Sequence, residues 1–350
     1  MRVAIEAASL ALSSGGLARY TCELSLALAR AFPGDEYYLI SDQPFSMPGG
    51  APPNLKRGGG PHNAIERRWW LWGISREAAR LRADVVHGPD FSVPYLARRP
   101  SVLTLHDLSP WMNERWHRGA TRVRRRTPIL LDLGLATMVI TPSELVRKQA
   151  IDRFRLLPET VVTVPEAAAP WLRPVATRVL SPYFLFVGTL EPRKNLEALL
   201  EAWRGVHVRH GVELVIAGRR RTDAPPIGEE PGLRLEGEVA DEDLAALYSG
   251  ALAFVYPSLY EGFGLPVLEA MQCGAPVIAS RAVREAAGDA ALYADTAEEL
   301  ARAMSEIAGS PDLAATLRIR SLARAREFSW DRTARLTREV YEEARNRFGR

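Results

Sequence analysis

Two glutamates with seven residues between them flank a glycine-containing turn in the second half of the chain. Glu261 stands directly before Gly262-Phe263-Gly264-Leu265, and Glu269 follows shortly after it. Glycines let a backbone approach a ligand closely, and a helix that begins near Pro266 would direct free backbone N–H groups at an anion. A carboxylate is a poor neighbour for phosphate, so the two glutamates suit hydroxyl groups instead. An anion site beside hydroxyl-binding acids predicts a nucleotide sugar as the ligand.

Apolar runs on both sides of this turn predict the elements that position it. Residues 251–256 read as a buried strand, residues 275–279 read as the next strand, and a short helix between them would end near Gly274. The turn therefore follows the carboxyl end of a strand, where open α/β sheets bind their ligands. The alternative is an ordinary strand–turn–helix unit that carries two surface glutamates.

A second turn carries two cations. It spans residues 188–195, follows a predicted strand at residues 183–187, and places Arg193 and Lys194 at the start of a helix. Arginine binds a diphosphate through its planar fork, and lysine binds it as a point charge. Cations at a helix N-terminus are unfavourable unless an anion offsets the helix dipole. A diphosphate site is therefore favoured over the alternative of two surface side chains.

These two turns resemble motifs of a known family. Glu261 and Glu269 resemble the E-x7-E motif of retaining glycosyltransferases with the GT-B fold, in glycosyltransferase family 4, and the similarity extends over residues 257–280. The run Gly-Thr-Leu-Glu-Pro-Arg-Lys-Asn at 188–195 is similar to the diphosphate-binding turn of bacterial mannosyl- and rhamnosyltransferases in that family. The resemblance implies an α/β fold with two Rossmann-like, doubly wound domains that face each other across a cleft.

The implied activity is the transfer of a hexose from a nucleoside diphosphate sugar to an acceptor hydroxyl, with retention of the anomeric configuration. GDP-mannose is the first expectation for the donor, and synthesis of a cell-surface polysaccharide or glycolipid is the expected setting. Arg193 and Lys194 would stabilise the departing diphosphate, so neither a metal ion nor a cofactor is expected. Glu269 would hold the ribose hydroxyls, and Glu261 those of the transferred sugar.

Further donor contacts are expected on both halves of the chain. His106 follows a short predicted strand, and relatives carry a histidine there that contacts the donor sugar; the alternative is a histidine that caps a strand end. The turn at Gly15 and Gly16 lacks the G-x-G-x-x-G fingerprint, which argues against a dehydrogenase. Arg193, Lys194, Glu261 and His106 are thus the catalytic candidates. The donor-binding candidates are Gly15, Gly16, Gly188, Glu238, Val239, Gly262, Phe263, Gly264, Leu265 and Glu269.

Length and composition suit two domains. At 350 residues the chain is too long for one typical core. We expect an N-terminal acceptor domain at 1–165, a proline-rich linker at 166–182, a donor domain at 183–327 and a helix at 328–350 that crosses back to the first domain. Cys22 and Cys273 read as reduced core residues, and no signal-peptide pattern or membrane-spanning run is present. The expected location is cytoplasmic, with peripheral attachment at the inner face of the cell membrane as a hypothesis.

Two stretches of the first half bear on the acceptor. Residues 65–81 predict a helix with tryptophans and arginines, which suits either a membrane interface or a core helix with a basic outer face. The most basic stretch contains Arg115, Arg118, Arg122, Arg124, Arg125 and Arg126. It would attract an anionic membrane surface or the phosphate of a soluble acceptor, unless it is only a solvated face. The expected partners are a nucleotide sugar, a glycan, glycolipid or small-molecule acceptor, and no nucleic acid.

Two other functions remain compatible with these motifs. A nucleotide-sugar epimerase of similar architecture would need further acid and base residues in the first domain, and it would form product without an acceptor. A non-catalytic subunit that binds nucleotide sugars would show no turnover with a crude acceptor extract. The presence of both glutamates and both cations together favours the transferase.

Overall fold

The computed structural model of the chain describes residues 1–12, 15–116, 119–177 and 181–349. Two compact units make up the chain: unit 1 is Met1–Glu166 with Ser329–Arg350, and unit 2 is Ala167–Phe328. Each unit is built on one parallel sheet, so the expected α/β class with two Rossmann-like units is confirmed. Within the segment expected to link the domains, Ala169 and Leu172 are buried in the core of unit 2.

The sheet of unit 1 has seven strands in the order β3-β2-β1-β4-β5-β6-β7. Its strands are β1 (Arg2–Glu6), β2 (Glu36–Ile40), β3 (Leu55–Arg57), β4 (Val85–Gly88), β5 (Ser101–Thr104), β6 (Met138–Thr141) and β7 (Val161–Thr163). Its α-helices are α1 (Gly16–Ala31), α2 (Ile74–Arg80), α3 (Ser109–Met112), α4 (Thr121–Asp132), α5 (Glu144–Phe154) and α12 (Trp330–Arg347). Strands β4, β5 and β6 are buried at every residue, as expected for a parallel sheet that is covered on both faces.

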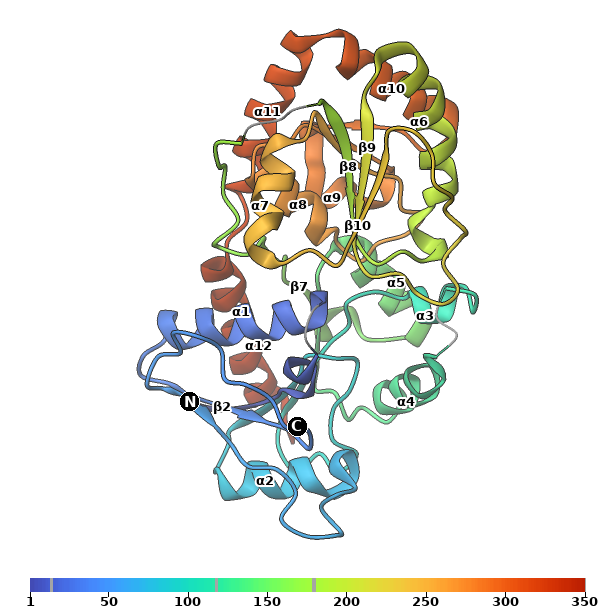
Figure 1. Cartoon of the computed structure of the whole chain (residues 1–350). Coiled ribbons are helices and arrows are strands. Elements are labelled where there is room, and N and C mark those ends of the chain that lie inside the picture. Colours follow the sequence, from blue (N-terminus) through green and yellow to red (C-terminus); the bar gives the residue numbers. More distant parts are fainter. Residues whose placement is uncertain (13–14, 117–118, 178–180, 350) are drawn as a thin grey trace. The chain divides into compact units, whose positions relative to one another are not determined.

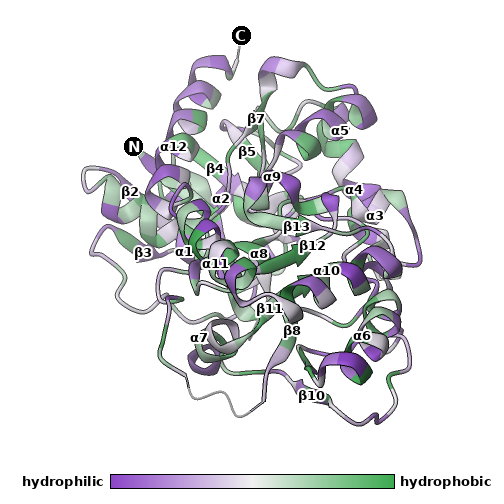
Figure 2. Ribbon diagram, turned by 90° about the horizontal axis from the view of Figure 1, so that it is seen from above, coloured by the Kyte–Doolittle hydropathy of each residue, from purple (hydrophilic) through white to green (hydrophobic). Residues whose placement is uncertain are grey.

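The sheet of unit 2 has six strands in the order β10-β9-β8-β11-β12-β13. They are β8 (Tyr183–Val187), β9 (Glu213–Ala217), β10 (Leu233–Gly237), β11 (Ala253–Tyr256), β12 (Val277–Ala279) and β13 (Ala291–Tyr293). The helices are α6 (Leu196–His210), α7 (Asp241–Gly250), α8 (Leu265–Gln272), α9 (Arg284–Ala287), α10 (Ala297–Gly309) and α11 (Pro311–Ala325). Helices α6 and α10 cover one side of the strands and α7 and α8 the other (Figure 1). The inner strands β11 and β12 are among the most hydrophobic segments (Figure 2).

The last helix, α12, belongs to unit 1, where it lies beside α1 (Figure 1). The buried Tyr341 hydroxyl lies 2.8 Å from Nδ1 of His87, and Nε2 of that imidazole lies 2.8 Å from the hydroxyl of Thr104. Burial, with the charge of His106, lowers the pKa of His87 to about 3, so the ring is neutral. This chain of polar contacts ties α12 to strands β4 and β5.

The structure corrects the expected helix at residues 65–81. A π-helical turn, η2 (Trp69–Gly73), precedes the shorter α2, and Trp69 is buried in the core. Glu66 is also buried, and its carboxylate is ion-paired with Arg80 and lies 3.6 Å from Arg76. The tryptophans therefore pack inward, which matches the core alternative rather than an exposed membrane-binding face.

The basic stretch lies in and before α4. Arg115, Arg122 and Arg125 are exposed, Arg124 and Arg126 are partly buried, and Arg118 lies outside the described residues. Ser13 and Ser14 of the first turn also lie outside them. Among the described residues, no helix is both long and apolar enough to cross a bilayer.

Candidate active site

The two expected turns of unit 2 meet at the centre of its sheet. Strands β8 and β11 are neighbours, and this is the point where the order of strand addition changes direction. Ligands of open α/β sheets bind outside the carboxyl ends of the strands at such a point. The turn that follows β8 carries Arg193 and Lys194, and the loop that follows β11 carries Glu261.

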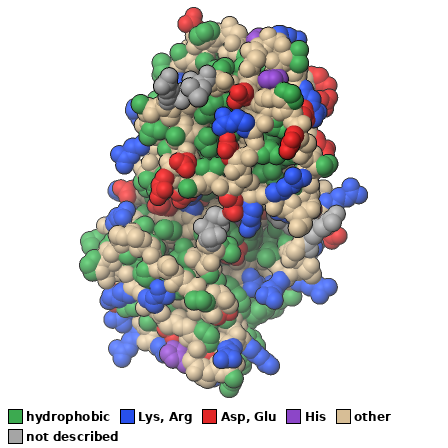
Figure 3. Space-filling view, viewed as in Figure 1, with side chains coloured by type: hydrophobic (Ala, Val, Ile, Leu, Met, Phe, Trp, Pro, Cys, Tyr) green, Lys and Arg blue, Asp and Glu red, His purple; other side chains and the backbone are tan. Residues whose placement is uncertain are grey.

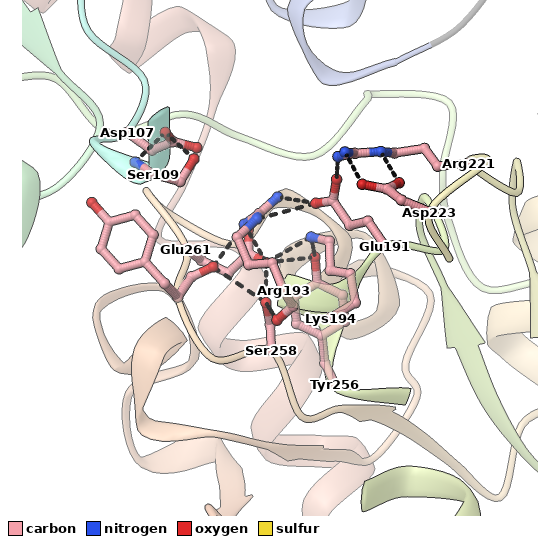
Figure 4. Close-up of polar contacts among 11 residues, drawn as sticks. Asp107, Ser109, Glu191, Arg193, Lys194, Arg221, Asp223, Tyr256, Ser258 and Glu261 are labelled. Atoms are coloured by element: carbon pink, nitrogen blue, oxygen red, sulfur yellow. Dashed lines mark hydrogen bonds and ion pairs between the residues drawn. The ribbon is translucent and has the colours of Figure 1, made fainter. Parts of the chain in front are cut away.

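Side chains of these two turns form one buried ion cluster (Figure 4). The Glu261 carboxylate lies 2.9 Å from Nη1 of Arg193 and 2.6 Å from Nζ of Lys194. Lys194 also donates to the Tyr256 hydroxyl over 2.5 Å, and the Ser258 hydroxyl lies 2.5 Å from the same Glu261 oxygen. All three charged residues are less than a tenth exposed. The structure thus brings three of the four catalytic candidates together.

The electrostatics of the cluster keep Glu261 ionised. Burial acts to raise the pKa of Glu261, but the charges of Arg193 and Lys194 outweigh burial and bring that pKa down to about 2. Burial lowers the pKa of Lys194, and Glu261 partly offsets this effect. Burial also raises the pKa of Tyr256 well above its ordinary value. At neutral pH the cluster is therefore an anion held between two cations, with a neutral phenol beside it.

Two residues of the cluster were not predicted from the sequence. One Glu191 oxygen accepts from Nε and Nη2 of Arg193 over 3.1 and 2.7 Å, and the other accepts from Nη1 of Arg221 over 2.5 Å. Arg221 is in turn paired with Asp223 over 2.8 Å. Glu191 is part of the recognised run at 188–195, but Arg221 lies in a loop whose sequence carries no periodic signal. The pairing depends on β8 and β9 being neighbours, which only the fold reveals.

The glycine-containing loop has the expected helical exit. Gly264 adopts a positive φ of 108° and directly precedes α8, which has a proline in its first turn. Gly262 and Phe263 are buried, and Leu265 is partly buried. Glu269 lies inside α8, 3% exposed, and its carboxylate accepts from the Tyr248 hydroxyl over 3.1 Å.

The remaining donor-binding candidates of unit 2 follow neighbouring strands. Gly188 follows β8 and donates its N–H to the Ala217 carbonyl over 3.0 Å. Glu238 and Val239 follow β10; Glu238 is exposed, and Val239 packs against the core. All of these residues lie at the carboxyl edge of the same sheet.

His106, the fourth catalytic candidate, belongs to unit 1. Its Nδ1 lies 3.0 Å from the Glu166 carboxylate and its Nε2 lies 2.7 Å from the Pro89 carbonyl. Burial acts to lower the pKa of His106, but Glu166 outweighs burial and the pKa is raised. Because both ring nitrogens face acceptors, the favoured form is an imidazolium that donates from both. Gly15 caps α1 with a φ of 121°, and Gly16 is the first residue of that helix; both are exposed.

The second residue of the expected His106-Asp107 pair has a local role. Asp107 accepts from the N–H of Ser109 over 2.9 Å and from its hydroxyl over 2.6 Å (Figure 4). In the described part of the chain, no three His, Cys, Asp or Glu side chains are grouped as metal ligands would be.

Family models match both halves of the chain. A model described as glycosyltransferase family 4 matches residues 14–168, and a model described as glycosyl transferases group 1 matches residues 181–310. The O-antigen chain mannosyltransferase B of Escherichia coli is 33% identical over 283 residues, which cover 74% of each chain.

Solved structures share the fold. Sucrose-phosphate synthase from Thermosynechococcus elongatus superposes with a TM-score of 0.73 at 21% identity and covers 98% of each chain. Anabaena HepE, solved in complex with UDP and glucose, superposes with a TM-score of 0.74 at 17% identity and covers 98% of this chain and all of its own. With the two family models and the mannosyltransferase relative, these likenesses show that the chain belongs to glycosyltransferase family 4 and is a glycosyltransferase with the GT-B fold.

Proposed function

We propose that this glycosyltransferase moves a hexose from a nucleoside diphosphate sugar to an acceptor hydroxyl and retains the anomeric configuration. GDP-mannose is the proposed donor, because the relative that shares a third of its residues is named a mannosyltransferase. The neighbour solved with UDP and glucose supports the class of donor but carries a different base. Synthesis of a cell-surface polysaccharide fits the O-antigen relative.

The observation that carries this proposal is the meeting of Arg193 and Lys194 at the point where strand order reverses. Both cations lie on the turn after β8, and both reach the loop that opens α8. The leaving diphosphate gains charge as the glycosidic bond breaks, so fixed cations here act more strongly on the transition state than on the ground state. Glu261 would then hold hydroxyls of the transferred sugar, and Glu269 those of the ribose.

Retention and metal independence are parts of the same proposal. The acceptor would attack from the face that the diphosphate leaves, and the departing phosphate would take the acceptor's proton. His106, as an imidazolium, would contact the donor sugar, with Gly15, Gly16 and the Gly262–Leu265 backbone near the phosphates. The cations of the cluster would supply the positive field that a divalent ion supplies in other transferases.

A nucleotide panel tests the donor. GDP, UDP, ADP and dTDP are each added to the protein at about a hundred times the dissociation constant of the best binder, which stabilises a folded unit by about 2.7 kcal/mol. The expected result is a rise in melting temperature of several degrees with GDP, and transfer from GDP-mannose in excess chelator to give an axial linkage detected by NMR. Binding of none of the four nucleotides would refute the proposal.

We also propose that the acceptor is presented at an anionic membrane surface, where the enzyme binds peripherally. The support is a surface of unit 1 that mixes exposed cations with exposed apolar side chains. Arg115, Arg122 and Arg125 share the α3–α4 region with Met112, Ile129 and Leu133, each about half exposed or more. Lys and Arg side chains are scattered over the visible face of unit 1 (Figure 3). The rival is a soluble phosphorylated acceptor that these arginines clamp.

A further inference from the structure

The sheet of unit 1 has its own point at which strand order reverses. Strands β1 and β4 are neighbours there, just as β8 and β11 are neighbours in unit 2. The general rule for open α/β sheets predicts a ligand at the carboxyl ends of both pairs. In unit 2 that place holds the ion cluster. In unit 1 it holds two carboxyl groups, Glu6 at the end of β1 and Asp90 two residues after β4.

These two carboxyl groups differ from the ion-paired ones of unit 2. Glu6 is 2% exposed and accepts one hydrogen bond, from the Ala8 N–H over 3.1 Å. Burial raises its pKa to about 8, so it is mostly protonated at neutral pH. Asp90 is partly exposed, and it forms no hydrogen bond or ion pair with any residue that the structure describes. Burial raises its pKa, while the charges of His106 and Arg126 act to lower it.

Two buried donors nearby also lack partners. The Trp69 side chain is 2% exposed, and its indole N–H makes no hydrogen bond within the described residues. That N–H lies toward Glu6, because it acts to lower the pKa of Glu6. Nε of Arg126 is likewise buried without a partner among the described residues, and its guanidinium lies 4.6 Å from the centre of the Trp70 ring. A polar recess with unused donors and acceptors points to a ligand rather than to a packed core.

The backbone on both sides of Asp90 is held firmly. The Pro89 carbonyl lies 2.7 Å from the His106 imidazole, and the Phe91 carbonyl accepts from the Thr127 hydroxyl over 2.7 Å. Phe91 has a φ of 51°, which is strained for a bulky residue. Elements β5 and α4 thus fix the loop while the Asp90 carboxylate keeps its own hydrogen-bonding capacity.

We propose that this recess binds a neutral saccharide of the acceptor, with the Asp90 carboxylate accepting hydrogen bonds from its hydroxyl groups and Arg126 and Glu6 flanking it. The proposal rests on the proposed glycosyl transfer and names its acceptor class. A carboxylate repels phosphate, so the recess suits sugar hydroxyls and not the phosphate of a soluble acidic acceptor. The Trp70–Arg126 stack adds an apolar wall of the kind that sugar rings contact.

Direct binding of simple glycosides tests this site without donor chemistry. Methyl glycosides of mannose, glucose, galactose and rhamnose are titrated into the full chain by ligand-observed NMR, with inorganic phosphate as the anionic competitor. We compare the unmodified chain with Asp90→Ala, Asp90→Asn and the control Asp132→Asn, an exposed aspartate of α4. Loss of a hydrogen bond to a charged group should weaken glycoside binding about tenfold or more in Asp90→Ala. Asp90→Asn should be intermediate, and Asp132→Asn unchanged.

Binding of GDP by the same variants separates this proposal from the proposed function. We expect unchanged GDP affinity in all of them, which also shows that they are folded. The saccharide site is wrong if no glycoside binds the unmodified chain, if Asp90→Ala binds as the unmodified chain does, or if phosphate displaces the glycoside. Glycoside binding that depends on Asp90, in a chain that binds no nucleotide, would leave the site standing and overturn the proposed transfer.

Discussion

Glu261 and Glu6 show how neighbours decide the state of a buried carboxyl group. Both are almost fully buried, yet the pKa of Glu261 falls to about 2 and that of Glu6 rises to about 8. Burial acts to raise both values, so the difference comes from the two cations that contact Glu261. Removing one partner of a buried ion pair leaves a charge uncompensated. Single substitutions in the cluster will therefore alter stability as well as catalysis, and the experiments must separate the two.

Lys194 allows this separation. Lys194→Met should lower turnover at saturating donor about a hundredfold, because it removes a cation from the leaving diphosphate. It should also destabilise the protein by about 3 kcal/mol, since Glu261 then keeps only Arg193. The double variant Lys194→Met/Glu261→Gln should recover much of the stability but not the turnover. Kinetics and urea unfolding measure the two effects, with the exposed Lys148→Met as the control. Full turnover in Lys194→Met would exclude the proposed role.

Glu6 should make stability depend on pH. Its folded-state pKa of about 8 exceeds the model value of 4.5, so the folded state binds this proton more tightly than the unfolded state does. The contribution of Glu6 to stability is therefore greatest below pH 4.5 and is lost as the pH rises through 8.

Glu6→Gln should remove this dependence. Between pH 5 and pH 8.5, its stability relative to the unmodified chain should rise by on the order of a few kcal/mol. Urea unfolding at both pH values measures the difference, and Glu159→Gln, an exposed glutamate, is the matched control. An equal pH dependence in Glu6→Gln and the unmodified chain would show that Glu6 ionises freely.

At the scale of elements, the sequence predicted best where local signals and fold agree. The strand at 183–187, the capped start of α5 at Ser143 and the proline in the first turn of α8 depend on short-range chemistry, and all three are present. The helix at 65–81 was wrong because Glu66 is held by arginines a turn or more away, and Gly73 packs directly against the Trp69 ring. Strand β3 was missed because three residues inside a loop rich in proline and glycine carry no periodicity.

The site follows the same division. The positions of Arg193, Lys194 and Glu261 on their turns were predictable, because each turn has a recognisable sequence. Their ion pairing, the contribution of Arg221 and the recess at Asp90 were not, because each depends on which strands are neighbours. Long-range pairing of this kind leaves no trace in residue spacing.

Gly218 joins the turns of unit 2 to one another. It follows β9 with a φ of 137°, and a Cβ placed there would lie 2.0 Å from the Gly188 carbonyl oxygen. Gly218→Ala should therefore displace the turn that carries the cations, and we expect a loss of about 2 kcal/mol or more together with weaker GDP binding. Gly228→Ala, where a Cβ would meet nothing within 4 Å, is the control. Equal stability of the two variants, measured by urea unfolding, would contradict the close approach.

At the scale of the whole molecule, charge is divided unevenly between the units. The net charge of +3 is small, but Lys and Arg outnumber Asp and Glu in unit 1, and the reverse holds in unit 2. An anionic surface would therefore attract unit 1 and repel unit 2. The tryptophans at 69–72 no longer support this attraction, because they pack inward. The exposed arginines and apolar residues around α4 remain to account for it.

Binding to vesicles tests this division of charge. Each cation near an anionic bilayer contributes about 1 kcal/mol, and the attraction falls off within a Debye length. Changing Arg115, Arg122 and Arg125 to Ala together should then weaken binding to phosphatidylserine vesicles about a hundredfold, and high salt should weaken it in the unmodified chain. A triple change of exposed arginines in unit 2, at Arg302, Arg320 and Arg326, is the matched control and should have little effect. Co-sedimentation measures all three proteins. If the unmodified chain stays in the supernatant at low salt, the acceptor is not met at an anionic membrane, and the soluble acceptor replaces it.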